Sequence, residues 1–290
     1  MVIATWWETA EWVALLGDSK GAKVHFIQGY DPYYYVPIER CKAAFRLRTH
    51  KIVVCSELRD LVQANFGDGA VDVVLNDVDR DQFFAPERGK QPVPTVGFIY
   101  ASGGLKGVDV ALKAIERLRE RFGDLRVIAF GSQVPSPNLR LPPYVEMRLA
   151  PPQNQLRDLY ASCDVWLSAS RHEGFNMPAM EAMACRTPVV VTRTGWPVEA
   201  FQDRVNGVLV DIDDVDGMAA AAEWVLALDD AEWRALSRRA FETATAGSWE
   251  QSGEAFERAL YRACGRAVRG EIAGRSSLTA QECEALAAGL

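Results

Sequence analysis

A strand-to-helix junction is predicted at residues 168–184, which read SASRHEGFNMPAMEAMA. The run just before it, Val165–Leu167, is continuous and apolar, as in a strand buried on both faces. Pro178 suits the first position of a helix, where its missing N–H costs nothing, and we expect Glu181 in the first turn of that helix. The residues from Gly174 to Met177 would then present backbone N–H groups at a helix N-terminus, which attract phosphate or sugar oxygens.

Two carboxylates bracket this candidate anion site. Glu173 lies in the loop ahead of the helix, and Glu181 lies within the helix. Carboxylate oxygens accept hydrogen bonds from paired hydroxyls, so the array fits a sugar nucleotide, with the sugar at one glutamate and the ribose at the other. Ligands of open α/β sheets collect at the carboxyl ends of the strands, where this loop would lie. The alternative is a glutamate placed near a helix start by the helix dipole alone.

Lys106 supports the functional interpretation. It follows a strand predicted at Thr95–Tyr100 and immediately precedes an amphipathic helix predicted at Val108–Phe122. It would therefore lie at the same carboxyl edge, as a cation for a diphosphate; the alternative is an ordinary surface lysine. The surrounding Gly-rich segment Ser102–Gly107 is not a Walker A loop, and the absence of GxGxxG leaves a dinucleotide site without support.

Short apolar runs alternate with helical patterns along most of the chain. Strands are predicted at Lys23–Ile27, Lys51–Cys55, Val71–Leu75, Thr95–Tyr100, Arg126–Phe130, Val145–Arg148, Asp164–Leu167, Pro188–Thr192 and Gly207–Val210. Alternating strands and helices indicate an α/β fold with parallel sheets covered on both faces.

Composition excludes several classes of protein. The 290 residues are 49% hydrophobic and 24% charged, which is ordinary for a folded domain, and the net charge of −7 argues against nucleic acid as the main partner. No run of 18 apolar residues predicts a membrane-spanning helix, and the first residues lack the basic start of a signal peptide. Six scattered cysteines without a CxxC pair predict reduced thiols, no metal site and a cytoplasmic location.

The junction also resembles a known family. The segment from Glu173 to Ala184, followed by Pro188-Val189-Val190, is similar to the signature of the glycosyltransferase family 4 enzymes, which retain anomeric configuration and have a two-domain GT-B fold. Further similar segments are Gly97–Gly107, Leu159–Val165, Asn206–Val210, Asn76–Pro86 and Ser248–Glu250. Residues 24–32 more weakly resemble polysaccharide-type members, including rhamnosyltransferases.

This resemblance implies a role for each candidate residue. Glu173 would contact the transferred sugar, Glu181 the ribose hydroxyls, and Lys106 the diphosphate. We expect Glu173 and Lys106 to be catalytic. The predicted donor-binding set is Gly103, Gly104, Lys106, Gly131, Glu173, Gly174, Phe175, Asn176, Met177 and Glu181. Family members are generally metal-independent, so we expect no metal and no cofactor beyond the donor sugar nucleotide; the acceptor would be a glycan or a lipid-linked molecule.

The chain departs from the family pattern at several positions. Ala101 stands where an Arg is usual, so a second cation on the diphosphate is missing unless Arg171 or Arg193 replaces it. Asn176 and Arg186 stand where Gly is usual. The family's N-terminal Gly-rich loop and first strands have no counterpart. The alternative to an active enzyme is therefore a silent or split sugar-nucleotide-binding subunit that needs a partner chain.

The expected organisation follows from a polar, Pro-rich stretch at residues 80–94 and from the resemblance. Predicted domains are a partial acceptor-side domain at 1–88, a donor-binding domain at 89–250, a C-terminal helix crossing back at 251–267 and a peripheral tail at 268–290. One domain would thus be a complete Rossmann-like sheet and the other a partial one.

Two surfaces suggest partners other than the substrates. Trp6, Trp7 and Trp12 are expected to form an apolar surface through which the chain associates with itself or with a partner. A basic run at residues 40–51 is expected to be a solvated helix face, and the alternative is peripheral contact with anionic lipid or a phosphorylated acceptor.

Overall fold

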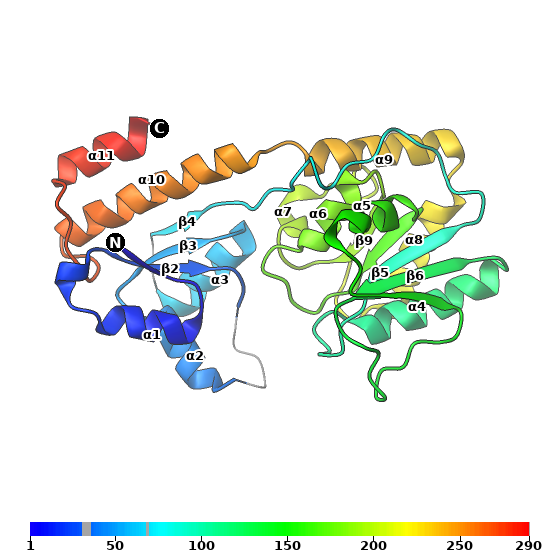
Figure 1. Ribbon diagram of the computed structural model, residues 1–290, viewed down its shortest axis with the longest axis horizontal. Coiled ribbons are helices and arrows are strands. Elements are labelled where there is room, and N and C mark those ends of the chain that lie inside the picture. The colour runs from blue at the N-terminus through cyan, green and yellow to red at the C-terminus, as the bar shows by residue number, and fades with distance from the viewer. Residues whose placement is uncertain (31–35, 68–69, 290) are drawn as a thin grey trace. The chain divides into compact units, whose positions relative to one another are not determined.

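The computed structural model describes residues 1–30, 36–67 and 70–289. The chain forms two compact units: Met1–Asn76 together with Trp249–Leu290, and Asp77–Ser248 (Figure 1). The divisions fall after Asn76 and Ser248, whereas the sequence analysis placed them after residues 88 and 250. Of the segment 24–32 that resembles polysaccharide-type enzymes, residues 31 and 32 lie outside the described residues.

The second unit is built on a six-stranded parallel sheet in the order β10-β9-β8-β5-β6-β7. Its strands are β5 (Thr95–Ile99), β6 (Arg126–Gly131), β7 (Val145–Leu149), β8 (Val165–Ser168), β9 (Val189–Thr192) and β10 (Val208–Val210). Its helices are α4 (Val108–Arg121), α5 (Gln153–Ala161), α6 (Met177–Ala184), α7 (Pro197–Ala200), α8 (Val215–Ala227) and α9 (Asp230–Ala244). Helix α4 packs beside α8 and helix α6 beside α9 (Figure 1).

Burial explains why these segments form strands and helices. Strands β8 and β9 are buried at every residue, as expected of central strands covered on both faces. Helix α4 buries the apolar stripe that includes Val108, Ala111 and Ile115 against the sheet. Asp214 caps α8 by accepting a hydrogen bond from the Gly217 N–H at 2.8 Å, which satisfies one of the helix's otherwise unpaired donors.

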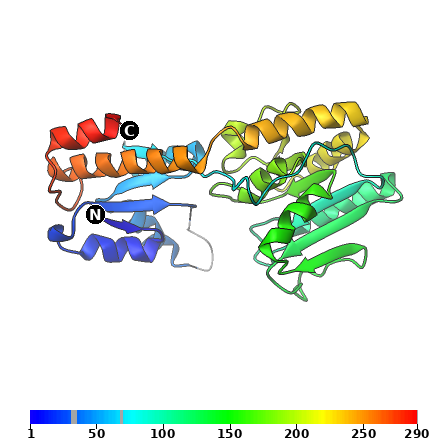
Figure 2. The same ribbon diagram turned by 45° about the horizontal axis from the view of Figure 1, so that its top comes forward.

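The first unit contains a four-stranded parallel sheet in the order β1-β2-β3-β4. The strands are β1 (Val2–Ala4), β2 (Lys23–Ile27), β3 (His50–Val53) and β4 (Val71–Val73). The helices are α1 (Trp7–Leu15), α2 (Ile38–Phe45), α3 (Ser56–Phe66), α10 (Trp249–Val268) and α11 (Ala280–Gly289), with a short 3-10 turn at Asp18–Lys20. Helix α10 lies along one face of the sheet and α1 along the other (Figures 1 and 2). Small residues of α10 such as Ala259 and Ala263 let it approach Val24 and Ile52 of the sheet.

The predicted fold class, α/β with parallel sheets, is confirmed, and each of the nine predicted strands is present. The sequence analysis did not predict β1, whose three residues are too few for a periodic signal; it is recognised by its pairing with β2. No helix among the described residues is long and apolar enough to cross a membrane.

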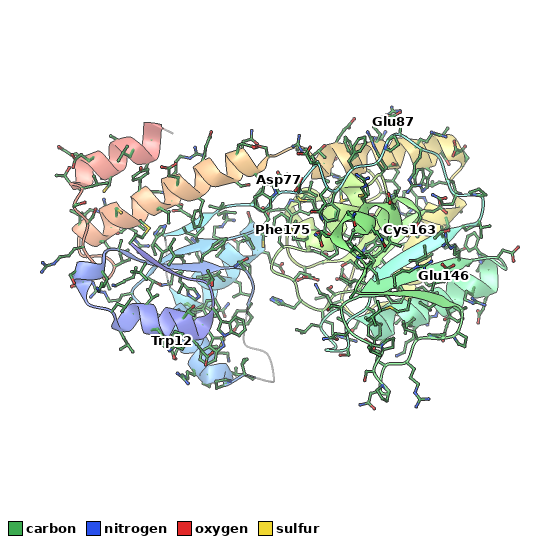
Figure 3. All side chains as sticks on the ribbon, in the orientation of Figure 1. Trp12, Asp77, Glu87, Glu146, Cys163 and Phe175 are labelled. Atoms are coloured by element: carbon green, nitrogen blue, oxygen red, sulfur yellow. The ribbon has the colours of Figure 1, made fainter. Side chains whose placement is uncertain are left out.

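Two surface expectations need correction. Trp7 is buried, with 3% of its area exposed, because it packs into the first unit, so the apolar surface expected of three tryptophans is reduced. Trp12 of α1 is 62% exposed (Figure 3), and Leu15, three residues later in the same helix, is also exposed. Lys51 of the basic run is also buried, and its ammonium donates to the carbonyls of Leu47 and Thr49 instead of facing water.

Candidate functional site

The candidate site lies where the strand order of the second unit reverses direction. From β5 the chain proceeds outward to β6 and β7, and then returns to the other side of β5 with β8, β9 and β10. The loops after β5 and β8 therefore diverge at their carboxyl ends, which is where open α/β sheets bind ligands. Lys106 lies in the first of these loops and Glu173 in the second.

Lys106 and Glu173 form a short ion pair across this point. The Lys106 Nζ lies 2.6 Å from the Glu173 Oε1, and the Ser170 hydroxyl donates to the same oxygen at 2.6 Å. The Glu173 side chain is only 10% exposed, whereas the Lys106 side chain is 29% exposed. The backbone N–H of Glu173 donates to the Thr194 hydroxyl at 3.0 Å, which fixes the loop. This pair places a cation and a carboxylate side by side at the carboxyl edge of the sheet.

Glu181 is held by a buried tyrosine. The Tyr160 hydroxyl of α5 donates to the Glu181 Oε2 at 2.7 Å. Burial raises the pKa of Glu181, while the Tyr160 hydrogen bond and the nearby Lys106 charge oppose that rise. Because α6 begins at Met177 and Pro178 is its second residue, Glu181 is the fifth residue of the helix. The expectations of Pro178 in first position and Glu181 in the first turn are therefore wrong by one residue.

The start of α6 is built by an unusual backbone conformation. Asn176 caps the helix with φ 82°, in the left-handed region that Gly and Asn tolerate best. Its carboxamide exchanges hydrogen bonds with the Ser168 hydroxyl at 3.0 and 3.2 Å. Within the described residues, the backbone N–H groups of Phe175 and Asn176 donate no hydrogen bond. These two groups lie at the helix N-terminus, whereas the sequence predicted free N–H groups over the whole segment from Gly174 to Met177.

Phe175 anchors the loop between β8 and α6. Its ring stacks on Trp196 with 5.4 Å between ring centroids, and its carbonyl accepts a hydrogen bond from the Trp196 N–H at 3.0 Å. Gly195 passes so close that a Cβ there would lie 2.9 Å from the Phe175 carbonyl oxygen. The loop is therefore held by ring stacking and by a backbone hydrogen bond.

The loop after β5 is joined directly to the loop after β8. Gly107 has φ 60°, and any side chain there would collide with the Ala169 carbonyl oxygen. Gly104 also has a positive φ, of 76°, and Gly103 has open space around its Cα. Gly131 ends β6 against Tyr100, where a Cβ would again collide with a carbonyl oxygen. Gly107 and Gly131 therefore allow the backbone to approach closely at the carboxyl edge.

Arg171 is committed to bracing this edge. Its guanidinium contacts the carboxylates of Asp109 at 2.8 Å and Asp213 at 2.7 Å, and it donates to the Gly104 carbonyl at 2.6 Å. The structure therefore does not present Arg171 as a substitute for the arginine that Ala101 replaces. Arg193 is 53% exposed and pairs with the exposed Asp211 at 3.3 Å, so it is the less constrained of the two cations.

The sequence analysis missed three residues of the site. Tyr160, Ser170 and Thr194 orient the two glutamates. Only Ser170 gave a local signal, since it lies three residues before Glu173. No group of three or more His, Cys, Asp or Glu side chains in the described ranges could hold a metal ion.

Comparison with known proteins finds glycosyltransferases that are similar to this chain. Residues 93–228 match the family model of the Glycosyl transferases group 1. A D-inositol 3-phosphate glycosyltransferase of Mycobacterium marinum is 32% identical over 248 residues, which are 76% of this chain and 52% of that protein. The chain thus spans about half the length of the curated relatives it matches.

Solved structures show the same fold. Sucrose-phosphate synthase of Thermosynechococcus elongatus matches 90% of this chain and 72% of its own, with a TM-score of 0.73 and 18% identity. HepE of Anabaena, crystallised with UDP and glucose, matches 78% of this chain and 67% of its own, with a TM-score of 0.63 and 17% identity. These solved structures confirm the predicted GT-B-like fold. The family model and the curated relatives support the resemblance to group 1 glycosyltransferases.

Proposed function

We propose that this chain, whose residues 93–228 match the model of the group 1 glycosyltransferases, moves a sugar from a nucleotide-diphosphate sugar to an acceptor hydroxyl. The observation that carries the proposal is the 2.6 Å contact between Lys106 and Glu173 at the switch point of the sheet. The contact brings together a cation suited to a diphosphate and a carboxylate suited to sugar hydroxyls. It lies in the place where α/β sheets bind nucleotides.

In this proposal each group has one task. Lys106 and the N-terminus of α6 bind the diphosphate, Glu173 binds the transferred sugar and Glu181 binds the ribose hydroxyls. The bond between the anomeric carbon and the diphosphate oxygen breaks, and the diphosphate leaves with the electron pair. The acceptor oxygen bonds to the anomeric carbon on the same face and gives its proton to the departing diphosphate oxygen, so that configuration is retained. Lys106 and the helix N-terminus stabilise the charge that grows on the departing diphosphate.

The finer features of the proposal come from the family resemblance. The transfer would serve polysaccharide or glycoconjugate synthesis in the cytoplasm, with a glycan or a lipid-linked acceptor. Residues 89–250 would bind the donor, residues 1–88 the acceptor, and residues 251–267 would return to the first domain. The exposed Trp12 and Leu15 support contact of α1 with a second copy, a partner chain or a membrane that carries the acceptor.

Calorimetry against UDP, GDP and dTDP tests the donor site. We expect one nucleotide to bind, and we expect Lys106→Ala and Glu181→Ala to weaken it about ten- to a hundredfold, the effect of losing a charged hydrogen bond of about 1.5–3 kcal/mol. Lys113→Ala, which removes an exposed lysine from α4, is the matched control and should bind normally. Binding of none of the three nucleotides, or equal binding by all variants, contradicts the proposal.

Turnover of the bound donor distinguishes an active enzyme from a silent or split subunit. The second possibility arises because Ala101 stands where the family usually has an arginine. We expect the chain to release the nucleoside diphosphate from the sugar nucleotide that it binds, and to do so faster when an acceptor is present. Tight binding without release under any condition would assign the silent role.

A further inference from the structure

A cavity of about 380 Å³ lies in the first unit, at the carboxyl ends of two of its strands. Gln28 directly follows β2, and the residues from Val74 to Asn76 directly follow β4. The first turns of α10, including Trp249 and Phe256, form the opposite wall. The volume falls within the range of small-molecule sites, and the position is the edge at which parallel sheets bind ligands.

The lining is aromatic and uncharged. Phe26 and Phe256 meet edge to face with 5.2 Å between their centroids, and the indole of Trp249 is 49% exposed. None of the nine lining residues carries a charge. An anionic ligand would therefore lose its hydration at this lining without gaining an ion pair in return.

Several polar groups of the lining have no hydrogen-bond partner among the residues that the structure describes. The carboxamides of Gln28 and Asn76 and the indole N–H of Trp249 form no hydrogen bond with any described residue, whereas Ser252 donates to the Leu75 carbonyl at 2.7 Å. A carboxamide both donates and accepts, as a hydroxyl does. A bound alkyl chain would leave these groups unmatched, while a sugar would match them and lay the C–H face of its ring on the aromatic wall.

We propose that this cavity binds an uncharged sugar ring of the acceptor, with Trp249 as the stacking surface and Gln28 and Asn76 as hydroxyl partners. The inference rests on the proposed glycosyl transfer and names the acceptor class for it. A second cavity of the unit, of about 480 Å³, does not compete for this role. It lies at the amino ends of β3 and β4, and its Arg266 and Arg269 are already paired with Glu271.

Saturation-transfer NMR with methyl α-D-glucopyranoside tests the inference on the full chain. We expect the ring protons to receive saturation, and we expect Trp249→Ala and Asn76→Leu each to weaken binding about fivefold or more. Trp12→Ala removes another exposed indole, from α1, and is the matched control, which should bind as the parent does. Because the two cavity variants alter different walls, a folding defect in one leaves the other informative, and circular dichroism identifies it.

The outcomes separate this inference from the proposed function. Nucleotide binding without any sugar signal, or a sugar signal equal in all variants, overturns the cavity assignment and leaves the donor site standing. Saturation of the octyl chain of n-octyl glucoside, with none for the methyl glycoside, assigns an alkyl ligand and overturns it as well. A Trp249-dependent sugar signal without nucleotide binding supports the cavity as a sugar site and contradicts glycosyl transfer.

Discussion

The hydroxyl of Tyr160 donates a 2.7 Å hydrogen bond to the carboxylate of Glu181, and this bond joins two neighbouring helices beneath the candidate donor site. Tyr160 is fully buried on α5, and burial together with the Glu181 charge raises its pKa well above the ordinary value. The raised pKa of Tyr160 favours the protonated hydroxyl, which is the form that donates this hydrogen bond. Its single contact fixes which oxygen of Glu181 is left for a ligand.

Removing that contact should weaken the donor site without removing the carboxylate. Tyr160→Phe keeps the packed ring but leaves the buried Glu181 oxygen without its donor, and we expect nucleotide affinity to fall about three- to tenfold, the worth of one hydrogen bond. Calorimetry with the nucleotide that binds the parent protein measures the change. Affinity equal to that of the parent would show that Tyr160 does not position Glu181.

The raised pKa of Glu181 predicts a pH-dependent change in stability. The folded protein holds the Glu181 proton to higher pH than the unfolded chain does, so this group's contribution to stability is lost as pH rises from about 4.5 through the folded pKa. Glu181→Gln removes the buried charge and preserves the acceptor for Tyr160. We expect its Tm to exceed that of the parent at pH 7.5, and the difference to shrink at pH 4.

The exposed Glu120 provides the control for this experiment. Glu120→Gln makes the same chemical change on the outer face of α4, and it should leave the Tm near the parent value at both pH values. A Glu181→Gln variant that is less stable than the parent at pH 7.5 would mean that the carboxylate gains more from Tyr160 and Lys106 than burial costs it.

Arg171 is expected to act through the loop that carries Lys106. It ties the Gly104 carbonyl to Asp109 at the start of α4, so Arg171→Met should let the loop move and raise the KM for the donor about tenfold, with a smaller effect on kcat. Arg171→Lys keeps the charge and should recover part of the loss. A variant that lowers kcat alone would instead place Arg171 at the reacting groups.

The fold could be predicted from the sequence because buried parallel strands consist of continuous apolar runs. The positions of Lys106 and Glu173 at the edge of the sheet could be predicted because both residues follow such strands. The side-chain contacts between different helices and strands could not be predicted from the sequence. Tyr160 looked like any core aromatic, since the helix packing that brings it to Glu181 leaves no trace in either segment alone. The predicted start of α6 was wrong by one residue because Asn176, in a left-handed conformation, lets the helix begin at Met177, ahead of Pro178.

The same reasoning clarifies the two positions where the family usually has glycine. Asn176 and Arg186 both have positive φ, of 82° and 64°. Glycine is favoured there by the backbone alone, and a side chain is accepted at the cost of some strain. These departures therefore alter local stability and do not remove a group that would touch a ligand.

A buried histidine predicts acid sensitivity in the first unit. Desolvation, with the charge of Lys51 adding to it, lowers the pKa of His25 to about 3, and its ring packs against Phe45. As pH falls below 6.5, His25 becomes protonated in the unfolded chain but stays neutral in the folded chain. The free energy of unfolding therefore decreases between about pH 6.5 and pH 3. His25→Leu removes this proton and should flatten the decline. Urea unfolding at pH 7.5, where His25 is neutral in both states, and at pH 5 measures it. Equal loss in parent and variant would show that other groups govern the acid response.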